Sequence, residues 1–412
     1  MASERGGGTA PLKGEDRGPV AVLTTGNPLI ARGGSGAYLA GFAEALRRAG
    51  RDLRLIGARP LSPGAGWGRM QADYLAPFDR IRMRRVLRLG PGLLARSPRA
   101  WQARLRRGGA PDEPLFTVPT AAEIAWAVQA VMAARPSLLV SNYFGGAAAF
   151  PHLPPDLPKA ILSHDVFRLK RASAAAAGVT LGWPERYDAQ EIEAFRAADI
   201  VLAIKQEEAD YIREVAPGTR TVLFPITVPV PDGPPPPAAG PICLLVGSRS
   251  HTNDDGLAWL LSQVWPRVTA LRPDARLRVV GRMAEAVPQP WPAGAEAVGF
   301  VDDLDAEHAA AAVALGPLRF GSGVKLKLVE ALAHGLPAVA TTSGAEGIAP
   351  APPPALRVAD APEAFAACVA EALGATDPAG DRLAARALAR ERFSLEVAGA
   401  RAAADLFAAA DE

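Results

Sequence analysis

The sequence predicts an α/β protein with two domains, each built around a mostly parallel sheet. Short apolar or β-branched runs alternate with longer segments whose apolar residues recur at helical spacing, and this alternation occurs in both halves of the 412 residues. Such alternation favours a parallel sheet covered by helices. Between the halves lies VPVPDGPPPPAAG, residues 228–240, whose prolines exclude a helix interior and a central strand. The proline-rich run therefore predicts a domain boundary.

The predicted organisation has five parts. Residues 1–18 are a polar, glycine-rich tail that we expect to be disordered, residues 19–228 are the first domain, and residues 229–240 are the linker. Residues 241–393 are the second domain, and residues 394–412 are a final helix that Ser394 is expected to cap. Two bodies joined in this way could close on a substrate.

The composition indicates the cellular compartment of the protein more clearly than its binding partners. A net charge of +2 and a pI near 8.6 do not imply nucleic acid, because the excess charge is small. Cys243 and Cys368 are the only cysteines, so neither a disulfide framework nor a cysteine-rich zinc site is available. No segment has the length and apolarity of a signal peptide core or a membrane span. We expect a cytoplasmic protein.

The predicted elements follow from periodicity and from turn residues. Strands are expected at residues 19–25, 51–56, 137–141, 160–163, 200–204, 221–224, 242–247, 277–281, 313–315 and 338–342. Helices are expected at residues 121–132, 187–197, 205–215, 362–373 and 379–392. The helix after the first strand should have Ser35 as its N-cap and end at Gly50, and Asn253 or Asp254 should cap the helix after residue 247.

Two loops of the first domain follow predicted strands and should face a cleft, where open α/β sheets bind ligands. The first carries Gly33 and Gly34, which lack the third glycine of a dinucleotide fingerprint; a simple tight turn explains the pair equally well. The second carries His164 and Asp165. Such a pair can fix the imidazole tautomer and offer a hydrogen bond to a ligand hydroxyl, although a single histidine is more often structural.

The most informative stretch is RFGSGVKLKLVEALAHGLPAVATTSGAEGI at residues 319–348, which is expected to fold as turn, helix, strand and loop. Ser322 and Gly323 lie in the turn, where the free amides at a helix start bind anions, and Lys325 and Lys327 add positive charge. Glu330, one turn further on, is placed to reach a hydroxylated group such as ribose. The alternative is that Lys327 and Glu330 form only a weak surface ion pair.

This stretch resembles the donor-binding signature of retaining GT-B glycosyltransferases of the family 4 group. The resemblance rests on the run Gly321-x-Gly323-x-Lys325-x-Lys327-x-x-Glu330-Ala331-x-Ala333-x-Gly335-x-Pro337, followed by Gly344-Ala345-Glu346-Gly347. It implies a GT-B fold, in which two Rossmann-like domains face each other across a cleft and a C-terminal helix crosses back to the first domain.

The resemblance also implies roles for particular residues. Glu330 would hold the donor ribose, and His164 would contact the donor sugar. The turn at Ser322 and Gly323, together with the loop at Glu346, would hold diphosphate and sugar, and Gly33 and Gly34 would lie beside the donor phosphates.

Two departures from the family pattern affect the donor site. Ser322 stands where many members have a sugar-facing Glu. Ser248 stands at the position of a phosphate-binding Arg, with Arg249 next to it, so Lys325 with Arg249 or Lys327 should neutralise the diphosphate. Asp303-x-Asp305 superficially matches the metal-binding pair of a different glycosyltransferase fold, but two carboxylates at a helix start are common for their dipole interaction alone.

The implied activity is transfer of a sugar from a nucleotide-diphosphate sugar to a glycan, lipid-linked or protein acceptor with retention of configuration. It requires neither a metal nor a separate cofactor, and the expected catalytic residues are His164, Lys325 and Glu330. Two alternatives stay open at this point. One is a GT-B sugar-nucleotide epimerase or hydrolase, and the other is a non-catalytic protein that binds sugar nucleotides or glycans.

A basic segment lies between Arg80 and Arg107, with many arginines and no acidic residue. Its interspersed apolar residues make an amphipathic basic surface plausible, which could lie on anionic lipid or bind an acidic polymer. A solvated helical face packed on the domain core is the alternative. Family members that use lipid-linked acceptors often dock to membranes through a basic patch on this half, so peripheral contact with the inner membrane face is one expectation.

Overall fold

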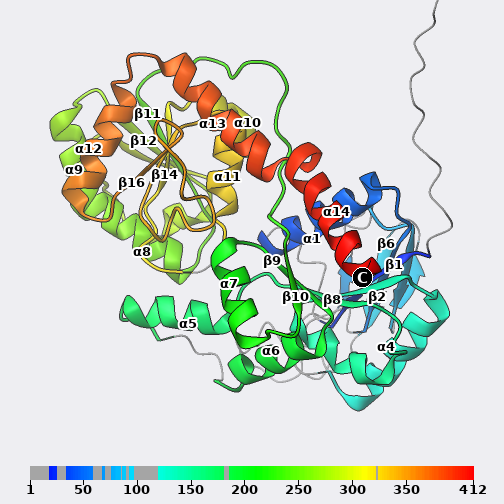
Figure 1. Ribbon diagram of the computed structural model, residues 1–412. Coiled ribbons are helices and arrows are strands. Elements are labelled where there is room, and N and C mark those ends of the chain that lie inside the picture. The colour runs from blue at the N-terminus through cyan, green and yellow to red at the C-terminus, as the bar shows by residue number, and fades with distance from the viewer. Residues whose placement is uncertain are drawn as a thin grey trace, which may run out of the picture.

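The computed structural model describes residues 18–25, 34–58, 67–69, 76–84, 86–89, 92–96, 119–180, 185–321 and 323–412. Two parallel sheets, one in each half of the chain, lie in separate lobes and are flanked by helices (Figure 1). The predicted α/β class with two Rossmann-like units is confirmed. Of the expected tail at residues 1–18, residues 1–17 lie outside the described residues, as does Gly33, whereas Gly18 is described and its carbonyl oxygen accepts a hydrogen bond from the Ser137 hydroxyl.

The first sheet has seven parallel strands in the order β10-β9-β8-β7-β1-β2-β4. They are β1 (Val20–Thr24), β2 (Leu53–Gly57), β4 (Arg80–Met83), β7 (Leu138–Asn142), β8 (Lys159–Leu162), β9 (Ile200–Ala203) and β10 (Arg220–Leu223). The four central strands are fully buried, as their apolar runs predict. Strand order reverses between β1 and β7, so a crevice is expected at the carboxyl ends of these strands.

The helices of the first domain connect these strands. They are α1 (Gly34–Arg48), α4 (Ala121–Ala134), the 3-10 segment η1 (Phe144–His152), α5 (Phe167–Ala176), α6 (Arg186–Ala197) and α7 (Gln206–Val215). A capping box between Thr120 and Glu123 starts α4. The prediction of Ser35 as an N-cap was wrong: it lies inside α1, and its hydroxyl is 2.5 Å from the Tyr143 hydroxyl.

The second sheet has six parallel strands in the order β13-β12-β11-β14-β15-β16. They are β11 (Ile242–Val246), β12 (Arg276–Val280), β13 (Ala295–Gly299), β14 (Val313–Gly316), β15 (Ala338–Ala340) and β16 (Leu356–Val358). Here the order reverses between β11 and β14. The loops after β11, β14 and β15 carry Arg249, Gly323 and Glu346, so the topology brings these three predicted residues to one edge.

The helical segments of the second domain are α8 (His251–Trp259), η2 (Leu260–Val264), α9 (Trp265–Leu271), η3 (Arg282–Ala286), α10 (Leu304–Ala310), α11 (Leu326–Ala333), α12 (Pro362–Leu373) and α13 (Pro378–Phe393). Ser250 caps α8 by accepting a hydrogen bond from the Asn253 amide, 3.2 Å away. The prediction of Asn253 or Asp254 as this cap was wrong, because the helix begins three to four residues earlier than that prediction requires.

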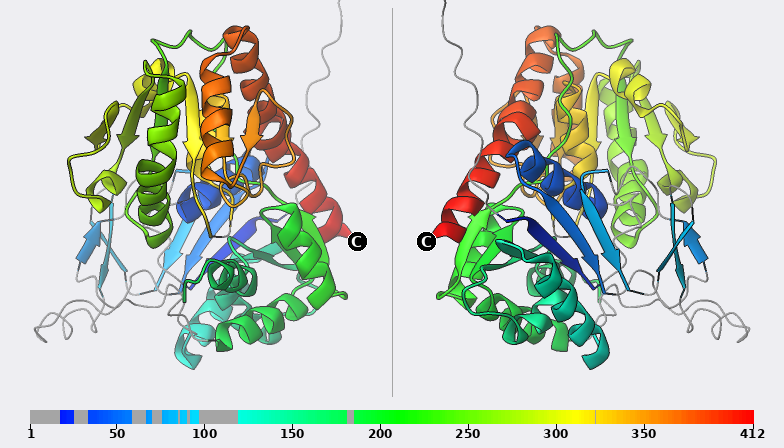
Figure 2. Two further views of the ribbon diagram at one scale, coloured as in Figure 1. Left: turned by 90° about the vertical axis from the view of Figure 1, so that its left-hand side faces the viewer. Right: turned by 90° about the vertical axis from the view of Figure 1, so that its right-hand side faces the viewer.

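The last segment, η4 (Leu395–Gly399) followed by α14 (Ala400–Asp411), returns to the first domain. Val228 pairs with Ser394 in an isolated bridge, and α14 then packs against α1, β9 and β10 (Figures 1 and 2). The Arg51 guanidinium lies 4.5 Å from the centre of the Phe407 ring. The predicted crossing is therefore confirmed, as is Ser394 as a cap, since its hydroxyl accepts from Val397 N at 3.2 Å.

The basic segment is not helical where it is described. Residues 80–83 form edge strand β4, while β5 (Val86–Leu89) and β6 (Gly92–Arg96) pair antiparallel, with β3 (Trp67–Arg69) beside β6. The helical alternative was wrong for these residues because their short β-branched and leucine-rich runs pair as strands. Residues 97–107 lie outside the described residues. Among the helices that the structure describes, none combines the length and apolarity needed to span a bilayer.

Candidate active site

A cavity of about 190 Å³ lies between the two domains. Most of its lining comes from the first domain, while the turn before α11 supplies the remainder from the second. The lining residues are Ser35, Tyr38, His164, Asp165, Lys170, Ile204, Ile226, Gly323 and Val324. The turn of the recognised signature and the loop at His164 therefore face each other.

His164 follows β8 and is only 4% exposed. Its Nε2 lies 2.7 Å from the Asn142 amide oxygen, while Nδ1 has no hydrogen-bond partner among the described residues. The ring stacks on Tyr143, with centroids 3.9 Å apart, and meets the edge of Tyr38. Burial lowers the pKa of His164 to about 3, so the imidazole is neutral at physiological pH. A neutral imidazole held through Nε2 presents Nδ1 as an acceptor.

Asp165 does not hold this imidazole as the sequence suggested. Asn142 takes that role, and the Asp165 carboxylate instead pairs with Lys170 of α5 at 3.0 Å. The reason is topological: Asn142 ends β7, the strand next to β8, so its side chain and that of His164 emerge side by side. Asp165 points instead toward the second domain, where a Cβ atom on Gly323 would lie 2.7 Å from its Oδ1.

The turn before α11 depends on glycine. Gly321 and Gly323 have φ values of 120° and 85°, in the region that only glycine adopts easily. Ser173 of α5 reaches this turn from the first domain: its hydroxyl lies 3.2 Å from both the amide nitrogen and the carbonyl oxygen of Gly321. Ser322 lies outside the described residues. Residues other than glycine at positions 321 and 323 would therefore strain the backbone of this turn. The turn also contacts the first domain through Ser173.

A buried charge cluster joins the domains beside this turn. Glu346 of the second domain pairs with Lys205 of the first, and Lys325 Nζ lies 3.5 Å from the second Glu346 oxygen. Glu208 lies 3.8 Å from Lys205 and has no exposed side-chain surface. Burial raises the pKa of Glu208 to about 8 despite the nearby Lys205, and burial lowers the pKa of Lys325 despite Glu346. Lys325 also donates to the Gly323 carbonyl at 2.6 Å, which fixes the turn.

Lys327 and Glu330 lie on the more exposed side of α11. Their side chains form an ion pair at 2.9 Å, as the surface-pair alternative predicted. The side chain of Glu330 is 28% exposed, so the pair is accessible to a ligand that would compete for the carboxylate. Arg249, in the loop after β11, pairs with Asp254 at 3.0 Å.

Comparisons with known proteins agree with this architecture. Residues 240–375, most of the second domain, match the family model described as glycosyl transferases group 1. Sucrose-phosphate synthase from Thermosynechococcus elongatus is 19% identical, with a TM-score of 0.64 over 95% of this chain and 100% of that chain. TarM from S. aureus has a TM-score of 0.68 at 8% identity, over 96% of this chain and 99% of that one. The chain has the GT-B fold.

A further GT-B relative in structure is HepE from Anabaena, solved in complex with UDP. It is 14% identical, with a TM-score of 0.62 over 95% of this chain and 100% of that chain. No curated protein sequence matches the chain. At these low identities, the similarity to the solved structures shows a shared fold. The match to the family model covers the half of the chain that carries the signature.

Sequence reasoning missed several residues at the GT-B cleft. Lys170 and Ser173 lie on α5, a helix that the sequence analysis did not predict, and Lys205 is the N-cap residue of α7. The signal for Lys205 was available: it lies two residues after the end of the buried strand β9, at the same edge as His164. Lys170 and Ser173 could not be predicted in this way, because nothing in the sequence shows that α5 approaches the other domain.

Proposed function

We propose that the protein is a retaining glycosyltransferase that moves a sugar from a nucleotide-diphosphate sugar to a hydroxyl of a glycan, glycolipid or protein. The observation that carries the proposal is the cavity between the domains, where the glycine turn of the signature faces His164. The match of residues 240–375 to group 1 glycosyl transferases supports the same activity.

In this proposal the donor nucleotide lies on the second domain. Glu330 accepts hydrogen bonds from the ribose hydroxyls, which requires that its ion pair with Lys327 open or rearrange. Lys327 is then free to meet the diphosphate, together with Lys325, Arg249 and the amides around Gly323. Because exposed ion pairs contribute only about 0–1 kcal/mol, the rearrangement costs little compared with binding of a charged ligand.

The proposed reaction is a front-side displacement. The bond between the anomeric carbon and the diphosphate oxygen breaks, the acceptor oxygen bonds to the same face of that carbon, and the acceptor proton passes to the departing diphosphate. Positive groups and amides at the glycine turn stabilise the charge that develops on the diphosphate. His164 offers its Nδ1 to a donor-sugar hydroxyl once neighbouring side chains shift, because this atom is buried in the structure. No protein nucleophile and no metal are needed, so transfer should persist in a chelator.

The ligands bound in similar structures support a nucleotide-sugar donor. HepE was solved with UDP and with UDP-glucose, and a TarM variant was solved with UDP and α-GlcNAc-glycerol. The expectation of a cytoplasmic protein that contacts a membrane surface through Arg80 to Arg107 stays part of the proposal; Arg80 and Arg82 are exposed on β4.

The first test is a thermal-shift screen against a panel of nucleotide sugars, followed by transfer assays with the sugar that stabilises best. Glu330→Ala should lower kcat/KM by about 100-fold or more, because a charge-assisted contact to ribose is lost. Asp210→Ala is the matched control, since it removes an exposed ion pair of the same spacing, Asp210 with Arg213 on α7. The control should keep full activity.

The outcomes separate this proposal from its alternatives. Turnover of the nucleotide sugar without any acceptor would favour an epimerase or a hydrolase. Stabilisation by nucleotide sugars without turnover, whichever acceptor is supplied, would favour a binding protein. Ser322 in place of the sugar-facing Glu is the reason to test for this outcome. Full transfer by Glu330→Ala would remove the proposed ribose contact.

A further inference from the structure

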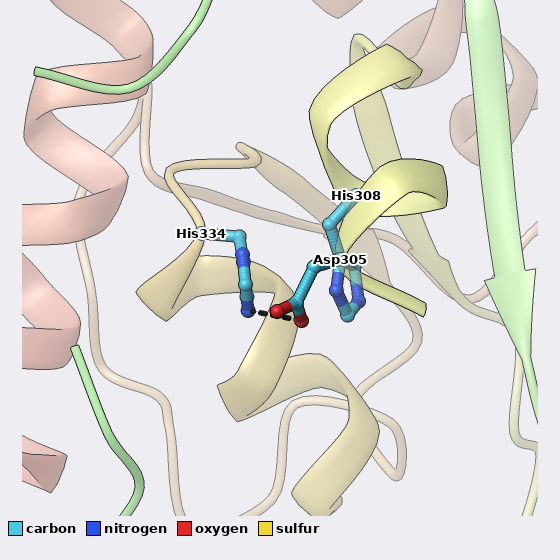
Figure 3. Close-up of side chains that lie close together, drawn as sticks. All are labelled: Asp305, His308 and His334. Atoms are coloured by element: carbon cyan, nitrogen blue, oxygen red, sulfur yellow. Dashed lines mark ion pairs between the residues drawn. The ribbon is translucent and has the colours of Figure 1, made fainter. Parts of the chain in front are cut away.

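A cluster of possible metal ligands lies on the second domain, outside the cavity. Asp305 and His308 are three residues apart on α10, a spacing that places both on one helix face. His334 is the C-cap residue of α11. One ligand atom from each of the three lies within 4.8 Å of the others. Figure 3 shows the Asp305 carboxylate beside both imidazole rings.

His308 is the strongest reason to look for a ligand here. The residue is 1% exposed, yet neither of its ring nitrogens has a hydrogen-bond partner among the described residues. Its ring stacks on that of His334, with centroids 4.5 Å apart and planes 23° apart. Buried polar atoms in proteins are normally paired, so two unpaired nitrogens on one buried ring require an explanation.

The other two residues complete a plausible coordination sphere. His334 Nε2 lies 3.4 Å from Asp305 Oδ1. In a tetrahedral site with metal–ligand distances of about 2.1 Å, neighbouring ligand atoms are about 3.4 Å apart. The observed separation therefore suits two ligands of one ion. It is long for a direct hydrogen bond.

The backbone that carries the three residues is held in place by neighbouring arginines. Arg386 of α13 donates to the His334 carbonyl at 3.1 Å and to the Ala333 carbonyl at 3.1 Å. Arg278 of β12 forms a two-bond contact with Glu307 of α10, at 2.8 and 2.7 Å. Ligands fixed in this way lose little freedom on binding an ion.

We propose that Asp305, His308 and His334 bind one divalent transition-metal ion of the zinc class and thereby join α10 to the end of α11. Two imidazoles and one carboxylate suit zinc, nickel or copper rather than magnesium or calcium. A water molecule would take the fourth position. The site does not line the cavity, but it lies next to the proposed donor residues on α11, since the charge of Lys327 acts on His308 and that of Glu330 acts on His334.

This proposal changes the interpretation of the Asp303-x-Asp305 pair. Asp303 caps α10 by accepting from the Ala306 amide at 3.1 Å, so the helix-dipole explanation fits that residue. Asp305 points elsewhere and meets the histidines. The informative sequence pattern is therefore Asp305-x-x-His308, with His334 supplied by the following helix.

Calorimetric titration of the tag-free, chelator-treated full chain with zinc chloride tests the site. We expect one zinc ion per chain and no comparable binding of magnesium. Asp305→Ala and His334→Ala should each weaken zinc binding at least about tenfold, because each removes a direct ligand. His251→Ala is the matched control, since His251 is an exposed histidine at the start of α8, and it should bind zinc like the unchanged protein.

A second measurement distinguishes loss of the metal site from failure of a variant to fold. Cobalt chloride should give visible d–d absorption of a low-coordinate site in the unchanged protein and in His251→Ala, and this absorption should be lost in Asp305→Ala. Circular dichroism establishes that each variant is folded; Asp305 is mostly exposed, so its replacement should not disturb packing. Absence of zinc binding, or zinc binding by folded Asp305→Ala and His334→Ala as tight as in the control, would overturn the proposal.

Discussion

At the scale of single residues, the environment of His164 decides what this side chain can do. Its burial between Tyr38 and Tyr143 keeps the ring neutral. Asn142 contacts Nε2, and Nδ1 has no partner among the residues that the structure describes. The sequence indicated the position of His164 correctly, since it follows a strand at the cleft edge. It could not indicate Asn142 as the partner, because that pairing depends on which strand lies beside β8.

The neutrality of His164 predicts a pH profile. A folded-state pKa of about 3, below the usual 6.5, means that His164 contributes stability above pH 6.5 that is lost as pH falls toward 3. Between about pH 5 and pH 8 its charge does not change. His164→Ala should therefore lower kcat/KM by about 10- to 100-fold through the lost hydrogen bond, by the same factor at every pH in this range.

Steady-state transfer assays across that range would check this, with His152→Ala, an exposed histidine, as the control that keeps full activity. A ratio of rates that titrates near neutral pH would instead mean that the imidazole becomes charged in the donor complex.

At the scale of elements, the turn before α11 shows that part of the signature is set by backbone conformation rather than by side chains. The glycines at 321 and 323 are predictable from sequence, because only a turn with positive φ needs them in this pattern. The contact of Gly323 with Asp165 is not predictable, since it depends on the distance between two domains. For the same reason the sequence did not reveal α5 as a wall of the cavity.

This contact predicts an asymmetry between two glycines. Gly178→Ala and Gly323→Ala both place a Cβ at positive φ, 74° and 85°, which should cost about 1–2 kcal/mol in unfolding free energy. A Cβ at Gly178 would meet no described residue within 4 Å, whereas a Cβ at Gly323 would lie 2.7 Å from Asp165 Oδ1. Only Gly323→Ala should also reduce nucleotide-sugar binding and transfer. Urea unfolding and donor titration would measure both effects, and equal activity in the two variants would contradict the role of this contact.

At the scale of the whole molecule, charge buried between the domains makes stability depend on pH. Lys205 and Glu208 come from the first domain, and Lys325 and Glu346 from the second. Sequence alone assigned Lys325 and Glu346 to a ligand. The structure shows that they also face each other and Lys205, a long-range arrangement that local pattern does not encode.

Glu208 provides the test at this scale. Its folded pKa of about 8 lies above the ordinary 4.5, so the folded state holds a proton that the unfolded state releases. Stability from this group is complete below about pH 4.5 and is lost as pH rises to about 8. Glu208→Gln removes that loss, so the variant should gain stability relative to the unchanged protein as pH rises, by at most about 4–5 kcal/mol.

Urea unfolding at about pH 5 and about pH 8.5 would measure the difference. Glu207→Gln, on the exposed side of the same helix, is the matched control and should show no such trend. A Glu208→Gln stability difference that is independent of pH would mean that the carboxyl ionises as readily in the folded protein as in the unfolded chain.

The pairing of Val228 with Ser394 has a mechanical consequence. The chain leaves the first domain at Val228 and re-enters it at Ser394, and these two passages lie side by side. If one lobe turned against the other, the two chain passages would place the axis near this pair, with α14 still packed on α1 and β10. Points far from the axis sweep the largest arcs, so small torsions in a few backbone bonds at this pivot suffice to admit and release large molecules at the opposite rim.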